Sequence, residues 1–215
     1  MRPAARFADP LHVIGPELDS LLGVLRDDVN LAVWERSLSA SVRHFLQAFM
    51  ARGIDLTEAC SLEVQDEAVA LQLPTLTNLA ADIPGYRDFM ADLKHLISLF
   101  SCLVDARTVG VRLRTLEQAM CPRWHVDKVP VRLVSSYVGP GCEWLPEQAV
   151  VRQALGSPAV DKTMANARAE KIAEGHVALL KGERWQGNQG RGLVHRSPAL
   201  QAGQRRLLLT LDWLA

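Results

Sequence analysis

The sequence predicts an α+β fold in which N-terminal helices, in residues 1–105, pack on a C-terminal portion made of strands, in residues 106–215. Apolar residues recur at helical spacing through most of the first half. From about Thr108 they alternate with polar residues, as in half-buried strands. A chain of 215 residues can bury one good-sized core but not two large ones. We therefore expect both portions to form one structural unit.

Helices are expected at four places in the first half. Apolar residues three and four positions apart predict two amphipathic helices between Pro16 and Arg52. These residues are Leu18, Leu21, Leu22, Leu25, Leu31, Trp34, Leu38, Val42, Phe45, Leu46 and Phe49. A third helix is expected over residues 56–70, and a fourth over residues 86–104, directly after the helix-breaking Pro84 and Gly85.

Strands are expected in the second half. The segments "VGVRLRTLEQ" (109–118) and "PVRLVSSYV" (130–138) combine alternation with β-branched residues. A turn-rich break follows, and the polar stretch of residues 157–175 has room for short helical pieces. Three closing strands are predicted in "HVALLKGERW" (176–185), "GLVHRSP" (192–198) and "RRLLLTLDW" (205–213).

Charge and hydropathy limit the classes of partner. Lys plus Arg and Asp plus Glu each number 24, so no net field attracts nucleic acid or an anionic membrane surface. The longest nearly apolar run, residues 96–104, is about half as long as a bilayer span. Four scattered cysteines without a CxxC pair fit reduced thiols. We expect a cytoplasmic protein that binds neither nucleic acid nor membrane.

The stretch "CPRWHVDKVP", residues 121–130, places His125 and Asp127 two positions apart in extended chain. Residues two apart in a strand face the same side, so an imidazole nitrogen and a carboxylate oxygen could reach one ion. On its own this pair is weak evidence, because a chain with six histidines can contain one HxD by chance in an ordinary polar turn. His195, at the end of a separate apolar strand, supplies the third ligand that a two-histidine, one-carboxylate metal site requires.

The last predicted strand carries a candidate anion site. Alternation puts Arg206 and Thr210 on one face and Arg205 on the other. A guanidinium can hold a carboxylate bidentately, and the Thr210 hydroxyl could donate to the same group. The alternative for Arg206 is an ion pair with Asp212 or Glu183 on neighbouring strands.

Two cysteines leave a zinc site open. Cys121 precedes His125 by four residues, and Cys142 follows the strand after Asp127. A zinc ion held by cysteine, histidine, aspartate and histidine is therefore conceivable. The glycine-rich stretch "GERWQGNQGRG" (182–192), by contrast, lies between two strands, whereas phosphate loops open a helix. We expect a hairpin or substrate-side loop there.

The order HxD, distant histidine, then arginine with threonine resembles the Fe(II)- and 2-oxoglutarate-dependent dioxygenases, over about residues 109–213. This resemblance implies a double-stranded β-helix, of the jelly-roll or cupin-like kind, for residues 106–215. It implies His125, Asp127 and His195 as ligands of Fe(II). It also implies that Arg206 and Thr210 hold the distal carboxylate of 2-oxoglutarate, with Tyr137 as a further contact of this co-substrate.

More closely, "CPRWHVDKVPVRLVSSYVGPGCEWLP" and "LVHRSPALQAGQRRLLLTLDW" resemble an uncharacterised bacterial family known only as domain of unknown function 1826. The resemblance includes the segment "NLAVWERSL" at residues 30–38. It implies an association with zinc homeostasis and gives no substrate.

The sequence thus leads to one expected function and two alternatives. We expect an Fe(II)- and 2-oxoglutarate-dependent oxygenase of the hydroxylase type, acting on a small molecule or a protein side chain. The first alternative is a non-catalytic cupin-like metal binder or sensor linked to zinc homeostasis, with Cys121 or Cys142 completing the metal shell. The second is a degenerate barrel used as an interaction module. Nothing in the sequence indicates the substrate or the oligomeric state.

Overall fold

The computed structural model describes residues 9–64 and 69–214. Seven strands form a large sheet in the order β1-β2-β8-β5-β10-β4-β3. Their bounds are Leu11–Gly15 (β1), Val29–Trp34 (β2), Thr57–Glu63 (β3), Thr108–Leu116 (β4), Val131–Val138 (β5), Val177–Lys181 (β8) and Arg206–Leu214 (β10). All neighbours pair antiparallel except β1 and β2, which are parallel.

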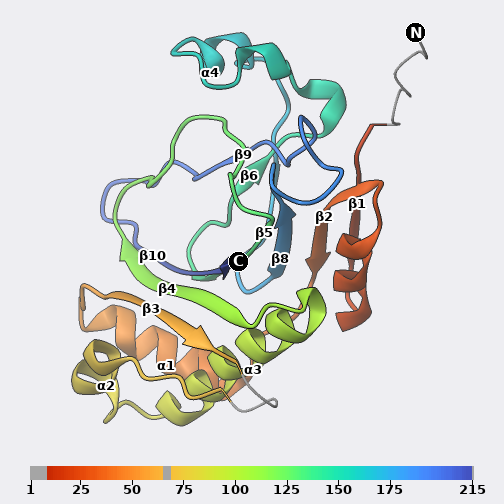
Figure 1. The fold of residues 1–215 in the computed structure, drawn as a ribbon. Helices are drawn as coiled ribbons and strands as arrows, with labels where there is room; N and C mark the ends of the chain where they lie inside the picture. The colour runs from red at the N-terminus through yellow and green to blue at the C-terminus, as the bar shows by residue number, and fades with distance from the viewer. Residues whose placement is uncertain (1–8, 65–68, 215) are drawn as a thin grey trace, which may run out of the picture.

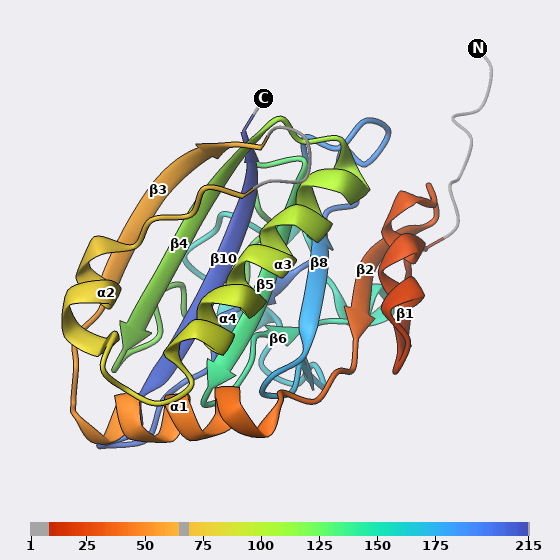
Figure 2. The same ribbon diagram turned by 90° about the horizontal axis from the view of Figure 1, so that it is seen from below.

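A small sheet lies on one side of the large sheet, and three helices lie on the other (Figures 1 and 2). The small sheet has the order β7-β6-β9, with bounds Glu170–Lys171 (β7), Glu143–Trp144 (β6) and His195–Arg196 (β9). The three helices are α1 (Ala40–Ala51), α2 (Pro74–Ala80) and α3 (Tyr86–Val104). Figure 2 shows α3 lying over the face of the large sheet. A further short helix, α4 (Val160–Thr163), lies beyond the small sheet (Figure 1).

Strand β10 shows how the chain fills both sides of the large sheet. Leu207, Leu209 and Leu211 join the core under the helices, together with Phe45 and Phe89. Leu208 points the other way, into a second apolar cluster. That cluster includes Val134 of β5, Leu180 of β8 and Trp144 of the small sheet. The alternation of a strand therefore gives β10 one face toward the helices and one toward the space between the sheets.

Several predicted elements are confirmed. The helix expected over residues 86–104 is α3. The strands expected near residues 109–118 and 130–138 are β4 and β5, and the last predicted strand is β10. The helix expected around Phe45 is α1, which begins after Ser39, whose side chain accepts a hydrogen bond from the backbone of Val42. The overall mixture of helices and sheets is the one predicted.

Two of the four predicted helices are wrong: the first of the two expected between Pro16 and Arg52, and the one expected over residues 56–70. Residues 29–34 form β2, which is buried on both faces and therefore reads as a continuous apolar run that imitates helical spacing. Residues 18–25 form a 3₁₀ helix and not an α-helix. In place of the helix expected over residues 56–70, β3 forms, and its Glu58 accepts a hydrogen bond from the backbone of Leu76 in α2. Residues 65–68 of that predicted helix lie outside the described residues.

The first 105 residues are thus less helical than predicted, and they supply three strands of the large sheet. Within the described residues, no helix combines the length and the apolar character needed to cross a bilayer.

Candidate metal centre

The three predicted ligands come together at the edge of the small sheet. One nitrogen of His125, one of His195 and a carboxylate oxygen of Asp127 lie within 4.8 Å of one another. His125 and His195 pair in antiparallel fashion, since the backbone N–H of each donates to the carbonyl of the other at 3.0 Å. Their rings lie 4.5 Å apart between centroids. In the part of the chain that the structure describes, this is the one cluster of at least three such ligand groups.

Backbone carbonyls orient both imidazoles. Nδ1 of His125 lies 2.8 Å from the carbonyl oxygen of Arg123, and Nδ1 of His195 lies 3.1 Å from that of Leu193. Because a carbonyl oxygen can only accept, each Nδ1 carries a proton, and in the neutral form of either ring the lone pair is on Nε2. The two Nε2 atoms lie 3.9 Å (His125) and 3.5 Å (His195) from the carboxylate of Asp127. Metal-binding histidines are commonly held in this way.

Asp127 presents one unsatisfied oxygen to His195. Its Oδ1 accepts a hydrogen bond of 2.8 Å from Arg132. Its Oδ2 is buried, has no hydrogen-bond partner in the protein, and is the oxygen 3.5 Å from Nε2 of His195. A buried carboxylate oxygen without a donor is costly unless a cation meets it. The donor set therefore fits a metal ion.

Burial keeps His195 neutral. The residue is 5% exposed, and desolvation lowers its pKa to about 4, although the negative charge of Asp127 acts in the opposite direction. At neutral pH the imidazole is therefore unprotonated, which is the form that binds metals. His125 is more accessible, with 30% of its side chain exposed.

An arginine that was not predicted from the sequence lies next to the cluster. Arg132, at the start of β5, donates both to Asp127 and to Asp212 of β10. Asp212 is also paired with Arg112 of β4. The missed signal was alternation, since Arg132 breaks the apolar pattern of β5 at a position that faces the space between the sheets.

Arg206 is buried on the same side of the large sheet. The residue is 1% exposed, and its guanidinium donates to Ser136 Oγ at 3.0 and 2.9 Å and to Cys142 Sγ at 3.4 Å. It forms no ion pair with a carboxylate of the described residues. Of the two partners considered from sequence, Asp212 binds other arginines, and Glu183 accepts from the backbone of the glycine-rich loop.

Arg205 points elsewhere, toward Asp55 and Glu117. Thr210 is buried, and it lies further along β10 on the same face as Arg206 and Leu208. Ser136, directly beside Arg206, was not identified from the sequence, although its position in the alternation of β5 places it on this face.

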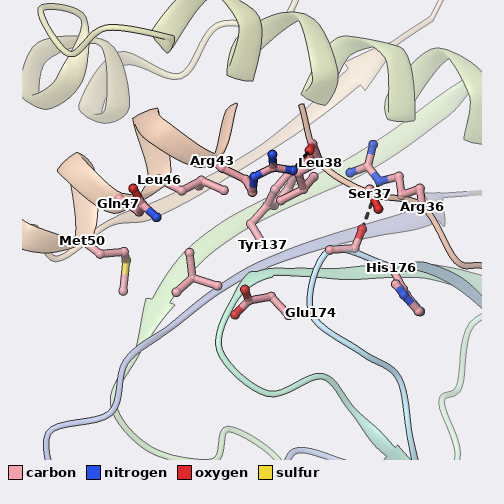
Figure 3. A pocket seen from close by; sticks show the side chains of 12 residues that line it. Arg36, Ser37, Leu38, Arg43, Leu46, Gln47, Met50, Tyr137, Glu174 and His176 are labelled. Atoms are coloured by element: carbon pink, nitrogen blue, oxygen red, sulfur yellow. Dashed lines mark hydrogen bonds between the residues drawn. The ribbon is translucent and has the colours of Figure 1, made fainter. Parts of the chain in front are cut away.

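Tyr137 does not lie with the other predicted site residues. It packs edge-to-face on Phe89 of α3 and donates a hydrogen bond to Asp92, on the helix side of the large sheet. Figure 3 shows it in the wall of a cavity of about 460 Å³ between α1, the end of β5 and the start of β8. Leu46, Met50 and Glu174 line the same cavity. The interpretation of Tyr137 as a co-substrate contact is therefore not supported by its position.

Neither candidate cysteine joins the metal cluster. Cys121 is exposed, and its backbone N–H donates to Ser197. Cys142 is buried against Arg206, and burial raises the pKa of its thiol. Among the described residues, the cluster therefore consists of two histidines and one aspartate.

The chain shares its fold with a plant dioxygenase. The dioxygenase for auxin oxidation 1 from Arabidopsis thaliana, solved as a binary complex with 2-oxoglutarate, superimposes with a TM-score of 0.52 and 12% identity, over 97% of this chain and 93% of that one. AviO1 from Streptomyces viridochromogenes Tue57 gives a TM-score of 0.47 and 17% identity, over 94% and 96% of the two chains. A Pseudomonas putida prolyl-4-hydroxylase gives a TM-score of 0.47 and 12% identity, over 92% of this chain and 98% of that one.

Comparison with curated proteins gives no match. One family, described as "Protein of unknown function (DUF1826)", matches residues 15–212, which is nearly the whole chain. The chain therefore belongs to the DUF1826 family.

Proposed function

We propose that the protein is an Fe(II)- and 2-oxoglutarate-dependent oxygenase built on a double-stranded β-helix, with His125, Asp127 and His195 as the metal ligands. The observation that carries this proposal is the buried guanidinium of Arg206, which has no carboxylate partner among the described residues and lies on the sheet face that also carries Arg132 and Asp212. A buried arginine usually pairs with a carboxylate. Here the missing partner is supplied by a dicarboxylate co-substrate.

The metal ligands support iron. Two imidazoles and one carboxylate with the remaining positions open are the donor set of non-haem Fe(II) oxygenases. His195 is neutral at pH 7, so it does not have to lose a proton to bind a divalent ion. Asp127 offers a buried oxygen without a donor. When bound, iron and 2-oxoglutarate supply the activation of O₂, coupled to oxidative decarboxylation of the co-substrate.

The residues of the chain bind, orient and exclude water. Arg206 holds the distal carboxylate of 2-oxoglutarate, and the Thr210 hydroxyl on the same face donates to it. Ser136 accepts two hydrogen bonds from Arg206 and so fixes the direction of the guanidinium. Leu31, Val33, Val134 and Leu180 line the interior between the sheets and keep it apolar, which strengthens charge interactions at the site. The substrate is a small molecule or a protein side chain.

Anaerobic titration tests the proposal. Adding Fe(II) and then 2-oxoglutarate to the metal-free protein should produce the weak visible charge-transfer band of the chelate. Arg206→Met should still bind Fe(II) but lose the band, because the distal carboxylate then has no anchor. Arg205→Met is the matched control: it removes the neighbouring arginine, which faces Asp55 and Glu117, and should keep the band. Iron binding without a band in the wild type would rule out 2-oxoglutarate as co-substrate.

Cobalt substitution tests the zinc alternative. A non-catalytic zinc binder would complete its metal shell with Cys121 or Cys142 and bind no co-substrate. The contact between Cys142 and Arg206 gives this thiol another partner, which favours the oxygenase. A cobalt-substituted protein with a strong sulfur-to-metal band in the near ultraviolet, lost in Cys142→Ser or Cys121→Ser, would instead favour the zinc site.

A further inference from the structure

Arg132 joins two carboxylates from different parts of the chain. Its Nη1 donates to Oδ1 of Asp127 at 2.8 Å. Its Nε and Nη2 donate to the two oxygens of Asp212 at 2.6 and 3.2 Å. The guanidinium therefore grips Asp212 as a fork and has one N–H group directed at Asp127, which is a candidate metal ligand.

Asp212 is a rigid anchor for this arginine. It lies opposite Arg132 in the register of β10 and β5, and only 3% of its side chain is exposed. Arg112, from β4 on the other side of β10, also pairs with it. Asp212 of β10 is thus fixed between arginines from the two neighbouring strands, β4 and β5. Burial acts to lower the pKa of Arg132, but the hydrogen bond to Asp212 and the charges of Asp127 and Asp212 outweigh it, so the pKa is raised and the arginine stays charged.

This arrangement makes the two oxygens of Asp127 unequal. Oδ1 accepts a hydrogen bond from Arg132 and lies 3.9 Å from Nε2 of His125, whereas Oδ2 is buried, has no donor, and lies 3.5 Å from Nε2 of His195. A carboxylate that could rotate freely could offer both oxygens to one ion. We propose that Arg132 is a positioning residue of the metal centre, which restricts Asp127 to binding the ion through Oδ2 and so leaves the other coordination positions for co-substrate and O₂. This inference rests on the proposed metal centre.

A structural explanation competes with this one, because Arg132 could serve only to neutralise the buried Asp212. Arg112 separates the two roles. It also pairs with Asp212, but among the described residues it has no contact with Asp127. A role limited to Asp212 would make the two arginines equivalent in their effect on metal binding, whereas positioning of Asp127 makes only Arg132 important.

Titration with Co(II), followed through its visible d–d bands, tests the inference without activity. Removing a positive charge beside the site would by itself strengthen the binding of a cation. A loss of affinity in Arg132→Met therefore reports on geometry. We expect a loss of about 10–100-fold, the usual effect of removing a group that orients a metal ligand, with a changed band shape. Arg112→Met should bind Co(II) within about twofold of the wild type, well below such a loss.

Two further variants separate positioning from charge and from folding. Arg132→Lys keeps the charge, but a lysine cannot grip Asp212 as a fork and also reach Asp127, so its affinity should also fall. In Arg132→Ala, millimolar guanidinium should restore part of the affinity, whereas urea, which is neutral and of similar shape, should not. Thermal unfolding of the metal-free variants identifies any that do not fold.

The outcomes distinguish the inference from the proposed function. If the wild type does not bind Co(II), the metal centre itself is wrong and the inference falls with it. If the wild type binds Co(II), and Arg132→Met and Arg132→Lys bind it equally well with the same spectrum, the metal centre stands and the positioning role is overturned.

Discussion

Lys181, at the end of β8, is a buried cation outside the metal centre. Its Nζ donates to the carbonyl oxygen of Arg26 at 2.7 Å and lies 4.7 Å from the ring centroid of Trp185. Desolvation lowers its pKa from 10.5 to about 8, although Asp27 and Asp28 act in the opposite direction. At any pH at which this lysine is protonated, its desolvation therefore lowers the free energy of unfolding.

The sign of the pH dependence follows from this shift. Between pH 8 and 10.5 the unfolded chain holds the proton more tightly than the folded protein, so the free energy of unfolding rises with pH in this window. Lys181→Met lacks this contribution. Relative to the variant, the wild type should gain on the order of 1 kcal/mol between pH 7 and 10, a figure reduced for solvent screening near the surface. Urea unfolding of both proteins at the two pH values measures it, and parallel pH profiles would contradict it.

Single residues were predictable where spacing alone places them. The HxD pair and His195 lie together as the sequence predicts, and alternation puts Arg206 and Thr210 on one face of β10. Tyr137 lies an even number of positions from Val131 and Leu133, so all three side chains face the helices. The alternation of β5 therefore argued against Tyr137 as a co-substrate contact. The contact between Arg132 and Asp212 could not be predicted, because it depends on the register that brings the two residues opposite each other.

At the scale of elements, a buried ion pair connects the helices to the large sheet. Arg36, just after β2, forms two hydrogen bonds with Asp92 of α3, and Tyr137 of β5 donates to the same carboxylate. The side chains of Arg36 and Asp92 are 5% and 19% exposed. Removing one partner of such a pair leaves a buried charge without compensation.

Asp92→Ala should lower the free energy of unfolding by about 3–5 kcal/mol, the usual cost of breaking a buried ion pair from one side. Asp82→Ala is the matched control, because it breaks an Arg–Asp pair of similar geometry that is 42% and 70% exposed. Exposed pairs contribute about 0–1 kcal/mol. Denaturant unfolding of both variants compares the two pairs, and equal losses would show that burial does not set the strength of the Arg36–Asp92 pair.

Helices and strands could be predicted where their apolar residues follow a single helical or strand period. The buried residues of helix α3 recur three and four positions apart, strand β4 alternates, and strand β5 contains β-branched residues. Strand β2 was misread because both of its faces are buried, which removes alternation. Strand β3 lies at the sheet edge, where its polar residues face solvent or α2, and its pattern carries little signal.

At the scale of the whole molecule, the N-terminal strands extend the large sheet, so the two predicted portions share one sheet. This could not be read from the sequence, because β2 pairs with β8 across about 150 residues and pairings of such long range leave no local pattern. The candidate metal centre joins distant segments in the same way. Its ligands come from the segment before β5 and from β9, about 70 residues later.

Metal binding should therefore stabilise the entire fold, since an unfolded chain cannot bring these ligands together. Co(II) at 100 times its dissociation constant should add about 2.7 kcal/mol to the free energy of unfolding. For a chain of this length that corresponds to a rise in Tm of about 5–10 °C. Differential scanning calorimetry of the metal-free and Co(II)-loaded protein measures the shift.

Asp127→Ala should remove this shift, because it deletes the ligand with the free buried oxygen. Asp161→Ala is its control: this aspartate accepts a hydrogen bond from the backbone of Trp124, next to His125, but is not in the metal cluster. Its Tm without metal will fall if that hydrogen bond matters, yet Co(II) should still raise it by the wild-type amount. An equal rise in Asp127→Ala would mean that the ion stabilises the protein from another site, and the assignment of the three ligands would then be wrong.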